Sequence, residues 1–345
     1  MGWLAGLIQR HWQHPRIVLV LLLWPLARLF QSIALLRCWL YKSGILPTKK
    51  LPCPVVVIGN IHVGGVGKTP LVAALVQTLQ QRQIRVGIIS RGYGRLSKET
   101  VILNAQSTAA EAGDEPLMLY QQTQAPVAVA STREAAGRAL LNAYPDLQLL
   151  LSDDGLQHYA LCRDMEVIVF PAADIGKKLD ILPNGPLREP AERLQGADAV
   201  VFSQGDANSV QQAQQLNLIK TQWCGFSQLN YGDFYSLNQP QKTAKAHEFS
   251  EKKCAAIAGI GQPQRFFQAL QILGIHLKET IALNDHATIQ PEDWPDAEII
   301  FITEKDAVKL KKPLQYNIWV LPLSAQICPD LAELIQLKLG LDRTK

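Results

Sequence analysis

The stretch from Pro54 to Val76, PVVVIGNIHVGGVGKTPLVAALV, limits the folds open to this chain more than any other part of the sequence. It starts with four β-branched residues, Val55 to Ile58, without polar alternation, which is typical of a strand buried on both faces. A glycine-rich turn follows, and the apolar residues after the turn recur at helical spacing. Strand, glycine loop and helix start in this order are the context of a Walker A phosphate loop.

The residues of this turn have the chemistry that a bound triphosphate requires. Glycines let backbone N–H groups converge on phosphate oxygens, and the helix N-terminus adds partial positive charge. Lys68 is expected to reach the β- and γ-phosphates, and the Thr69 hydroxyl is expected to bind Mg²⁺. The predicted nucleotide-binding residues are Gly64, Gly65, Val66, Gly67, Lys68 and Thr69.

The loop departs from the pattern G-x-x-x-x-G-K-[ST] at one position, where His62 stands in place of glycine. A glycine-rich turn without any ligand would account for the glycines. It would not account for Gly67-Lys68-Thr69 directly at a helix start. We therefore predict binding of ATP or GTP.

Charge is distributed unevenly along the 345 residues. Of the 34 Lys and Arg residues, 13 precede Glu99, the first acidic residue, so the remainder carries 21 against all 30 Asp and Glu. A cationic front on an acidic body suits an anionic membrane surface or a phosphorylated substrate, and it excludes a uniformly basic nucleic-acid binder. The six cysteines include no C-x-x-C pair, which speaks against a zinc site or a disulfide framework.

Residues 17–41 are long enough to span a bilayer, but the segment contains Arg28 and Arg37, and its uninterrupted apolar part, 17–27, is too short to span. Three interpretations stay open: a single span, an anchor in the membrane interface, or a helix packed on the protein's own core. Flanking Trp, Arg and Lys residues favour contact with a membrane. If the segment spans, Lys42, Lys49 and Lys50 place the body in the cytoplasm. We expect membrane association through the N-terminus.

Two glycine-containing motifs follow the phosphate loop. The strand Arg85–Ser90 ends in the basic loop RGYGR, in which Arg91 is either a ligand contact at the carboxyl edge of the sheet or part of a simple turn. Gly113-Asp114-Glu115-Pro116 precedes a helix, and the residues alone predict that Asp114 caps its N-terminus. A second helix is expected over Thr132–Leu141, with Arg133 on its solvent side.

An apolar strand then runs directly into Asp153 and Asp154, which is typical of a Walker B element that binds Mg²⁺. An Asp-Asp-Gly turn is the alternative, but two adjacent carboxylates favour a nearby cation. His158 follows close to this candidate metal site. The loop LPNGPLREP carries Arg188 and Glu189, which an exposed connection would also explain.

Repeated strand–helix units predict an α/β fold, a P-loop-type parallel sheet with helices on both faces. We expect a membrane-associated helical segment over 1–45, the P-loop core over 46–225, a linker over 226–245 and a smaller α/β domain over 246–345. Periodicity alone assigns no role to His286 or to the TEKD segment at 303–306.

Taken together, the motifs resemble one family, the tetraacyldisaccharide 4′-kinases of lipid A biosynthesis. The matching pieces occur in order over most of the chain: VIGNIHVGGVGKTP, SRGYGR, GDEPLM, SDDGLQH, LPNGPLREP, AIAGIGQPQRFF, DH and TEKDAVKL. The resemblance implies transfer of the γ-phosphoryl group of ATP, with Mg²⁺, to the 4′-hydroxyl of a tetraacylated glucosamine disaccharide 1-phosphate. It also implies action at the cytoplasmic face of the bacterial inner membrane.

The resemblance also implies roles for individual residues. Asp114 matches the carboxylate that activates the acceptor hydroxyl, paired with His286 from the second domain. This replaces the capping role, and an Asp held by a His is a reasonable base. The expected catalytic residues are Asp114, His286, Lys68 and Arg188; the expected metal ligands are Thr69, Asp153, Asp154 and Glu189; and His158 and Arg91 are expected elsewhere in the active site.

Two other functions remain as alternatives. A membrane-recruited regulatory ATPase of the MinD/ParA type shares the GGVGKT string, but its signature Lys would fall on Val63. A soluble P-loop kinase of a small metabolite would need no membrane contact. The expected partners are the lipid substrate and a membrane surface, with no nucleic acid and no obligate protein partner.

Overall fold

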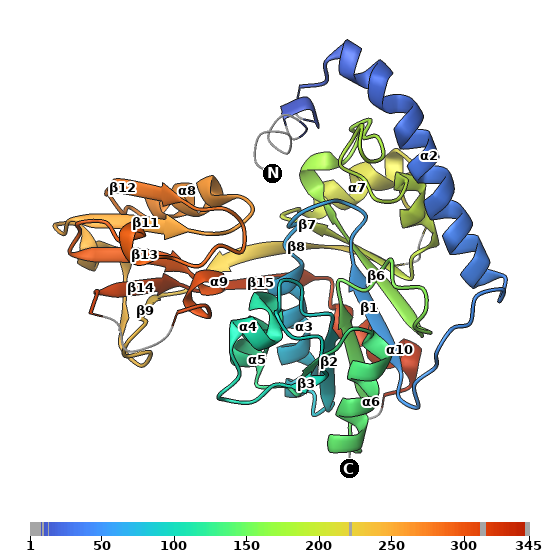
Figure 1. Cartoon of the computed structure of the whole chain (residues 1–345), viewed down its shortest axis with the longest axis horizontal. Helices are drawn as coiled ribbons and strands as arrows, with labels where there is room; N and C mark the ends of the chain where they lie inside the picture. The colour runs from blue at the N-terminus through green and yellow to red at the C-terminus, as the bar shows by residue number, and fades with distance from the viewer. Residues whose placement is uncertain (1–7, 9, 13, 221–222, 311–314, 342–345) are drawn as a thin grey trace.

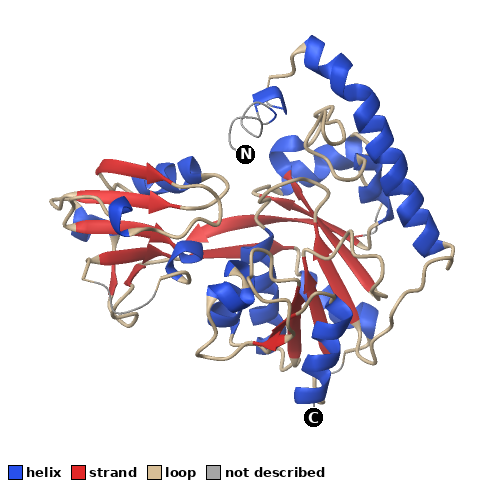
Figure 2. Cartoon of the chain, in the orientation of Figure 1, coloured by secondary structure: helices blue, strands red, loops and turns tan. Residues whose placement is uncertain are grey.

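The computed structural model describes residues 8, 10–12, 14–220, 223–310 and 315–341. These residues form two α/β units and a long N-terminal helix, α2 (Ile17–Lys42), which lies along one side of the larger unit (Figure 1). Each unit is built around its own sheet, as the arrangement of strands in Figure 2 shows. The predicted α/β class is confirmed.

The larger unit contains a nine-stranded sheet in the described part of the chain. Neighbours from β8 to β4 are parallel, and the two edge strands are antiparallel to them. The order is β15 (Leu323–Cys328), β8 (Trp223–Tyr231), β7 (Ala199–Ser203), β6 (Met165–Pro171), β1 (Val55–Gly59), β5 (Leu149–Asp153), β2 (Val86–Ser90), β4 (Val127–Val129) and β3 (Val101–Ile102).

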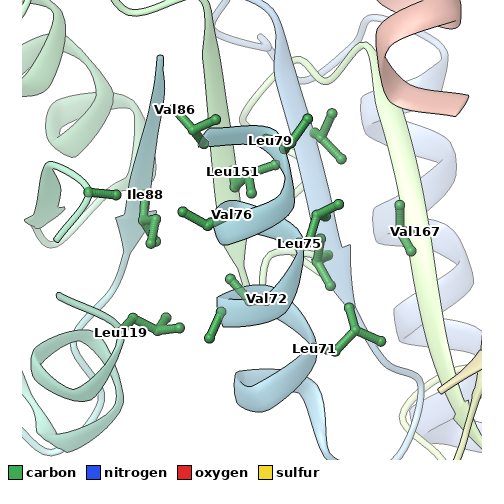
Figure 3. Close-up of a cluster of buried hydrophobic side chains, with 14 of the residues drawn as sticks. Leu71, Val72, Leu75, Val76, Leu79, Val86, Ile88, Leu119, Leu151 and Val167 are labelled. Atoms are coloured by element: carbon green, nitrogen blue, oxygen red, sulfur yellow. The ribbon is translucent and has the colours of Figure 1, made fainter. Parts of the chain in front are cut away.

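Successive residues of β1 point into different cores, which explains its unbroken apolar run. Val56 and Ile58 join a core beneath α3 (Lys68–Gln81), whereas Val55 and Val57 join a core beneath α6 (Arg133–Ala143). Figure 3 shows α3 packed with Leu71, Val72, Leu75 and Val76 toward the sheet. Further helices cover both faces: α5 (Asp114–Thr123) and α10 (Leu331–Leu339) on the α3 side, and α7 (Ala207–Gln215) on the other. Helices on both faces are therefore confirmed.

The smaller unit has a six-stranded sheet with two cores of its own. Its order is β10 (Thr243–Ala244), β9 (Phe234–Ser236), β14 (Ile318–Leu321), β13 (Ile299–Thr303), β11 (Cys254–Ala258) and β12 (Leu277–Ala282). The helix α8 (Pro263–Ile272) covers one face with Phe266, Phe267 and Leu270, and α9 (Glu304–Ala307) follows β13. Burial of two apolar faces gives this unit a core independent of the larger one.

The sheet topology divides the chain differently from the predicted boundaries. Residues of the predicted linker at 226–231 belong to β8, and 323–339, predicted in the smaller domain, form β15 and α10 of the larger unit. The strands β8 and β15 pair with each other and extend toward the smaller unit (Figure 1). The smaller unit is thus inserted between two neighbouring strands of the large sheet.

The remaining elements are short. They are α4 (Ala109–Ala112) and the 3₁₀ turns Ala172–Asp174, Ala191–Gly196, Ala246–Phe249 and Pro291–Asp293. Of the predicted 1–45 segment, residues 1–7, 9 and 13 lie outside the described residues. The helix α2 has the length and composition of a membrane span, and 6% of its most apolar window is buried in the protein.

Candidate active site

The phosphate loop joins β1 to α3 at the carboxyl edge of the large sheet. Gly67 is the N-cap of α3 with φ +82°, a left-handed conformation that favours glycine. The Val66 side chain is buried, while nothing lies within 4 Å of a Cβ built on Gly64 or Gly65. The loop therefore presents open backbone in front of a helix N-terminus, which is the geometry of an anion site.

His62, which departs from the glycine pattern, has a structural place. Its ring is buried against Phe170, with centroids 4.9 Å apart, and its Nε2 lies 3.1 Å from Asp174 Oδ2. Burial raises the pKa of Asp174, but the contacts with His62 and Lys177 outweigh burial and lower this pKa. The imidazole thus anchors the start of the loop to the segment after β6.

Lys68 and Asp154 meet in front of this loop. Lys68 Nζ lies 3.1 Å from Asp154 Oδ1, and Arg188 Nη1 lies 3.7 Å from Asp154 Oδ2. Burial raises the pKa of Asp154, but Lys68 and Arg188 outweigh burial, so its pKa is lowered. The predicted convergence of a loop lysine and a strand-end carboxylate is present in the structure.

Asp153 is almost completely buried at the end of β5. Burial, then Glu115 and Asp154, raise the pKa of its carboxyl group, and Lys68 opposes them. Among the described residues, Asp153 Oδ1 has no hydrogen-bond partner. A buried carboxylate oxygen without a partner is costly, so this oxygen is suited to a cation.

Arg133 was expected on the solvent side of its helix, and this prediction is wrong. The Arg133 side chain is buried, and one Nη2 donates to the carbonyl oxygens of Asp153 (2.9 Å) and Asp154 (2.6 Å). Helical spacing could not reveal this, because the contact is made to the end of another strand. Arg133 fixes the backbone that carries the two carboxylates.

The loop that contains Arg188 and Glu189 packs on the phosphate loop. Val63 N donates to Pro186 O (2.8 Å), and Arg188 N donates to Ile61 O (2.6 Å). Because Glu189 is buried, the alternative of an exposed connection is wrong. Both of its carboxylate oxygens accept hydrogen bonds, Oε1 from Gln157 Nε2 (2.7 Å) and Oε2 from the Tyr159 hydroxyl (2.8 Å).

Asp114 is the first residue of α5 and not its N-cap, which is Gly113. The capping role predicted from the residues alone is therefore wrong. Asp114 Oδ2 instead lies 3.0 Å from Nδ1 of His286, a residue of the smaller unit. The structure brings together the Asp and His that the family resemblance had paired.

The SRGYGR loop supports this contact. A Cβ on Gly92 (φ +66°) would lie 2.5 Å from Ala112 O, so glycine permits the loop to pack on the start of α5. The Tyr93 ring lies 5.3 Å from the His286 ring between centroids. The loop is therefore more than a simple turn after a strand.

His158 and Arg91 lie in a positively charged part of the site. Burial, then Arg133, Arg163, Arg37 and Arg91, lower the pKa of His158 to about 4. His158 is neutral at neutral pH as a consequence. No described contact joins Arg91 directly to the phosphate loop, but its charge also acts on Arg133.

Two charged residues that the sequence analysis assigned no role also lie here. Lys305 Nζ lies 3.0 Å from Asp285 Oδ1 and 3.4 Å from Glu115 Oε1. For Lys305 and Asp285, the TEKD motif at 303–306 and the DH motif at 285–286 were the only signals, and periodicity gave no reason to connect these two motifs.

Comparison with known proteins decides the family. The family model for the tetraacyldisaccharide-1-P 4′-kinases, LpxK, matches residues 19–340. The chain belongs to this family. This membership sets aside the MinD/ParA-type ATPase and the small-metabolite kinase as alternatives, and it agrees with the resemblance stated from the motifs.

Individual relatives agree with the family match. A tetraacyldisaccharide 4′-kinase of Neisseria meningitidis serogroup B is 52% identical over 330 residues, which are 95% of this chain and 94% of the relative. The corresponding protein of Chromobacterium violaceum is 43% identical over 96% of this chain and 98% of its own length. A crystal structure of LpxK from Aquifex aeolicus in complex with ATP is 29% identical, with a TM-score of 0.77 over 93% of this chain and 99% of that one.

Proposed function

We propose that this chain transfers the γ-phosphoryl group of ATP to the 4′-hydroxyl of tetraacyldisaccharide 1-phosphate in lipid A biosynthesis. Family membership supports the reaction class. The observation that carries the mechanism is the Asp114–His286 contact, at the same sheet edge as Lys68 and Asp154. In this proposal, a base for a hydroxyl and a cradle for a triphosphate lie at one edge of the large sheet.

The triphosphate binds, in this proposal, to the amides of Gly64, Gly65, Val66 and Gly67 and to the ammonium of Lys68. In the structure, Lys68 forms an ion pair with Asp154, and with nucleotide bound its ammonium would also contact phosphate oxygens. Arg188, beside the same carboxylate, adds positive charge where negative charge develops on the transferred group. Positioning and charge stabilisation supply most of the catalysis in phosphoryl transfer.

The donor set also fits Mg²⁺. Asp153 Oδ1 is buried without a partner among the described residues, and carboxylate and hydroxyl oxygens are ligands that Mg²⁺ prefers. We assign Thr69, Asp153 and Asp154 to the ion. Glu189 would support the ion through its negative charge, because its carboxylate oxygens already accept hydrogen bonds from Gln157 and Tyr159. The ion would neutralise charge on the β- and γ-phosphates.

Asp114 acts as the base in the transfer step. The 4′-hydroxyl loses its proton to Asp114 as its oxygen forms a bond to the γ-phosphorus, and the bond from that phosphorus to the bridging oxygen breaks to release ADP. His286 holds the carboxylate from the opposite unit. Contact between the units therefore completes the base, and it helps to exclude water that would compete with the hydroxyl.

His158 and Arg91 are assigned to the acceptor side of the site. A neutral imidazole among several arginines can donate to or accept from a sugar hydroxyl, while Arg91 adds charge for an anionic group. The acceptor for which the family is named, tetraacyldisaccharide 1-phosphate, carries a phosphate. The cluster is thus suited to a phosphorylated sugar.

The acceptor is a lipid, and α2 offers the means to meet it. Large apolar side chains such as Leu22, Leu29 and Trp39 are more than half exposed on this helix, and Arg28 forms an ion pair with Asp180 of the body. Such an apolar face is suited to a membrane. We place the protein at the cytoplasmic face of the bacterial inner membrane.

Transfer of label tests the function directly. The full chain is incubated with γ-labelled ATP, Mg²⁺ and tetraacyldisaccharide 1-phosphate, and the position of the new phosphate is identified by NMR. We expect a monoester at the 4′-oxygen. Label at another position, or release of inorganic phosphate without transfer, would contradict the proposal.

A further inference from the structure

Lys305 lies where the two units meet, on the far side of His286 from Asp114. Its side chain is 14% exposed at the start of α9. Its Nζ contacts Asp285 of its own unit and Glu115 of the larger unit. The same Nζ also lies 3.4 Å from His286 Nε2. One ammonium group therefore contacts both units and the outer nitrogen of the His286 ring.

Lys305 is a donor toward this nitrogen. Burial opposes its charge, but Glu115 and Asp285 outweigh burial and raise the pKa of Lys305 above its ordinary value. A charged ammonium has three N–H donors and no acceptor. His286 Nε2 must then accept, which leaves the ring proton on Nδ1, where it is donated to Asp114 Oδ2 at 3.0 Å.

Asp285 has the opposite effect on the ring. Its Oδ2 lies 3.6 Å from His286 Nε2, and an unopposed carboxylate there favours protonation of that nitrogen. Lys305 neutralises Asp285 through Oδ1 at 3.0 Å. Among the described residues, the charged or titratable groups in contact with His286 are Asp114 of α5, Tyr93, Asp285, and Lys305 of α9, and Glu115 of α5 contacts Lys305.

We propose that Lys305 is a positioning residue, which keeps His286 neutral with its proton on Nδ1 whenever the two units are in contact. This inference rests on the proposed role of Asp114 as the base. An imidazolium beside Asp114 would weaken that carboxylate as a base, whereas a neutral imidazole fixes one oxygen and leaves the other for the hydroxyl.

The loop that carries His286 is held by other residues. Lys309 Nζ donates to Ala287 O at 2.6 Å and forms an ion pair with the fully buried Asp306. His286 N donates to Gly259 O at 3.2 Å. Removal of the Lys305 ammonium should therefore alter the charge around the ring without releasing the loop.

The first test is the pH dependence of kcat for phosphoryl transfer with Lys305→Met. We expect the acid limb to move upward by about one pH unit, with kcat falling about tenfold on that limb and recovering at higher pH. Lys305→Arg keeps the charge and should restore the profile. The double variant Lys305→Met with Asp285→Asn removes both charges and should return the limb toward its original position.

The second test does not depend on turnover. The chain contains seven His residues, so a ring signal absent from His286→Gln assigns His286 in NMR spectra of the detergent-solubilised full chain. We expect Lys305→Met to let the ring proton of His286 leave Nδ1, because Nε2 loses its donor, and the chemical shifts of the two ring nitrogens report this change. The variant Lys253→Met with Asp296→Asn breaks another ion pair of the smaller unit and should leave these shifts unchanged.

Two results would overturn the inference. One is a loss of kcat in Lys305→Met by the same factor at every pH, and the other is unchanged chemical shifts of the His286 ring nitrogens. Failure of the proposed function is separate: if Asp114→Asn kept full transfer, the base would be wrong, while the nitrogen shifts would still report on the ring.

Discussion

The nucleotide site and the acceptor site differ in how they are assembled. The phosphate loop, Lys68 and Asp154 all belong to the larger unit and are held by neighbouring strands of one sheet. The Asp114–His286 pair joins two units through residues that are 172 positions apart. In the proposed mechanism, nucleotide can bind without the smaller unit, whereas the hydroxyl is activated only when both units are in contact.

Lys68→Ala should produce the largest effect on the nucleotide side. The variant loses the ammonium that stabilises charge on the transferred group, so we expect kcat to fall by roughly 10³-fold. Steady-state transfer to the disaccharide measures this, and circular dichroism checks the fold. Lys253→Ala, a surface lysine of the smaller unit, is the control. Unchanged turnover in Lys68→Ala would refute the phosphate-loop assignment.

Asp114→Asn should impair the proposed acceptor site and leave the nucleotide site intact. We expect kcat to fall by roughly 10²-fold, because the amide cannot take the proton, while the Kd for ATP remains unchanged. Calorimetric titration with ATP and Mg²⁺ gives the Kd. Asp146→Asn, at an exposed ion pair with Arg85, is the matched control. A parallel loss of ATP affinity in Asp114→Asn would mean that the sites are not separable.

Charges placed on the exposed face of α2 should weaken binding of the membrane and the lipid acceptor and leave ATP binding unchanged. Leu22→Glu with Leu29→Glu places two charges on the apolar face, so we expect at least about tenfold weaker flotation with anionic liposomes. The apparent KM for vesicle-borne acceptor should rise, and the KM for ATP should not. Leu22→Ala with Leu29→Ala keeps the face uncharged as a control. Equal flotation of all three proteins would contradict membrane contact through this face.

The smallest effect concerns stability and lies within the larger unit. The pKa of His158 is about 4 in the folded protein, below its ordinary value of 6.5, so the unfolded chain binds the extra proton between these values. The free energy of unfolding contributed by this group is then fully present above pH 6.5 and is lost as the pH falls toward 4. His158→Gln should lose less stability than the unsubstituted protein between pH 6.5 and pH 4. We expect this as a Tm at low pH that falls less, by a few degrees or fewer. Identical Tm profiles against pH would show that the imidazole stays accessible to protons.

Most of the nucleotide site could be predicted because it is local. The strand, the turn and the helix start are contiguous, and parallel strands place their carboxyl ends at one edge, so Asp153 and Asp154 were expected beside Lys68. Hydrophobic patterns also gave the strands at Val55–Ile58 and Arg85–Ser90, and the strand before Asp153, near their observed positions. The physical reason is that a central strand is buried on both faces. Val55 to Ile58 alternate between two cores, so each position is apolar and the run is visible in the sequence.

The acceptor site could not be predicted from pattern alone. Periodicity made Asp114 a helix cap, and only the family resemblance paired it with His286. Helical spacing predicted that Arg133 faces solvent. Its contact is made to the end of a strand distant in the sequence, which spacing within one helix cannot reveal. The return of the chain through β15 to the large sheet was missed as well, since no local signal says which sheet an amphipathic strand will join.

The pairing of β8 with β15 also shows how the smaller unit could be excised. Tyr231 and Leu323 lie opposite each other where the two strands leave the large sheet. A two-residue turn between them would close a β-hairpin and leave all nine strands connected. Such a shortened chain would retain the cradle for the triphosphate and lose the histidine proposed to complete the base. The architecture is that of a nucleotide-binding domain with a second unit inserted at a single hairpin.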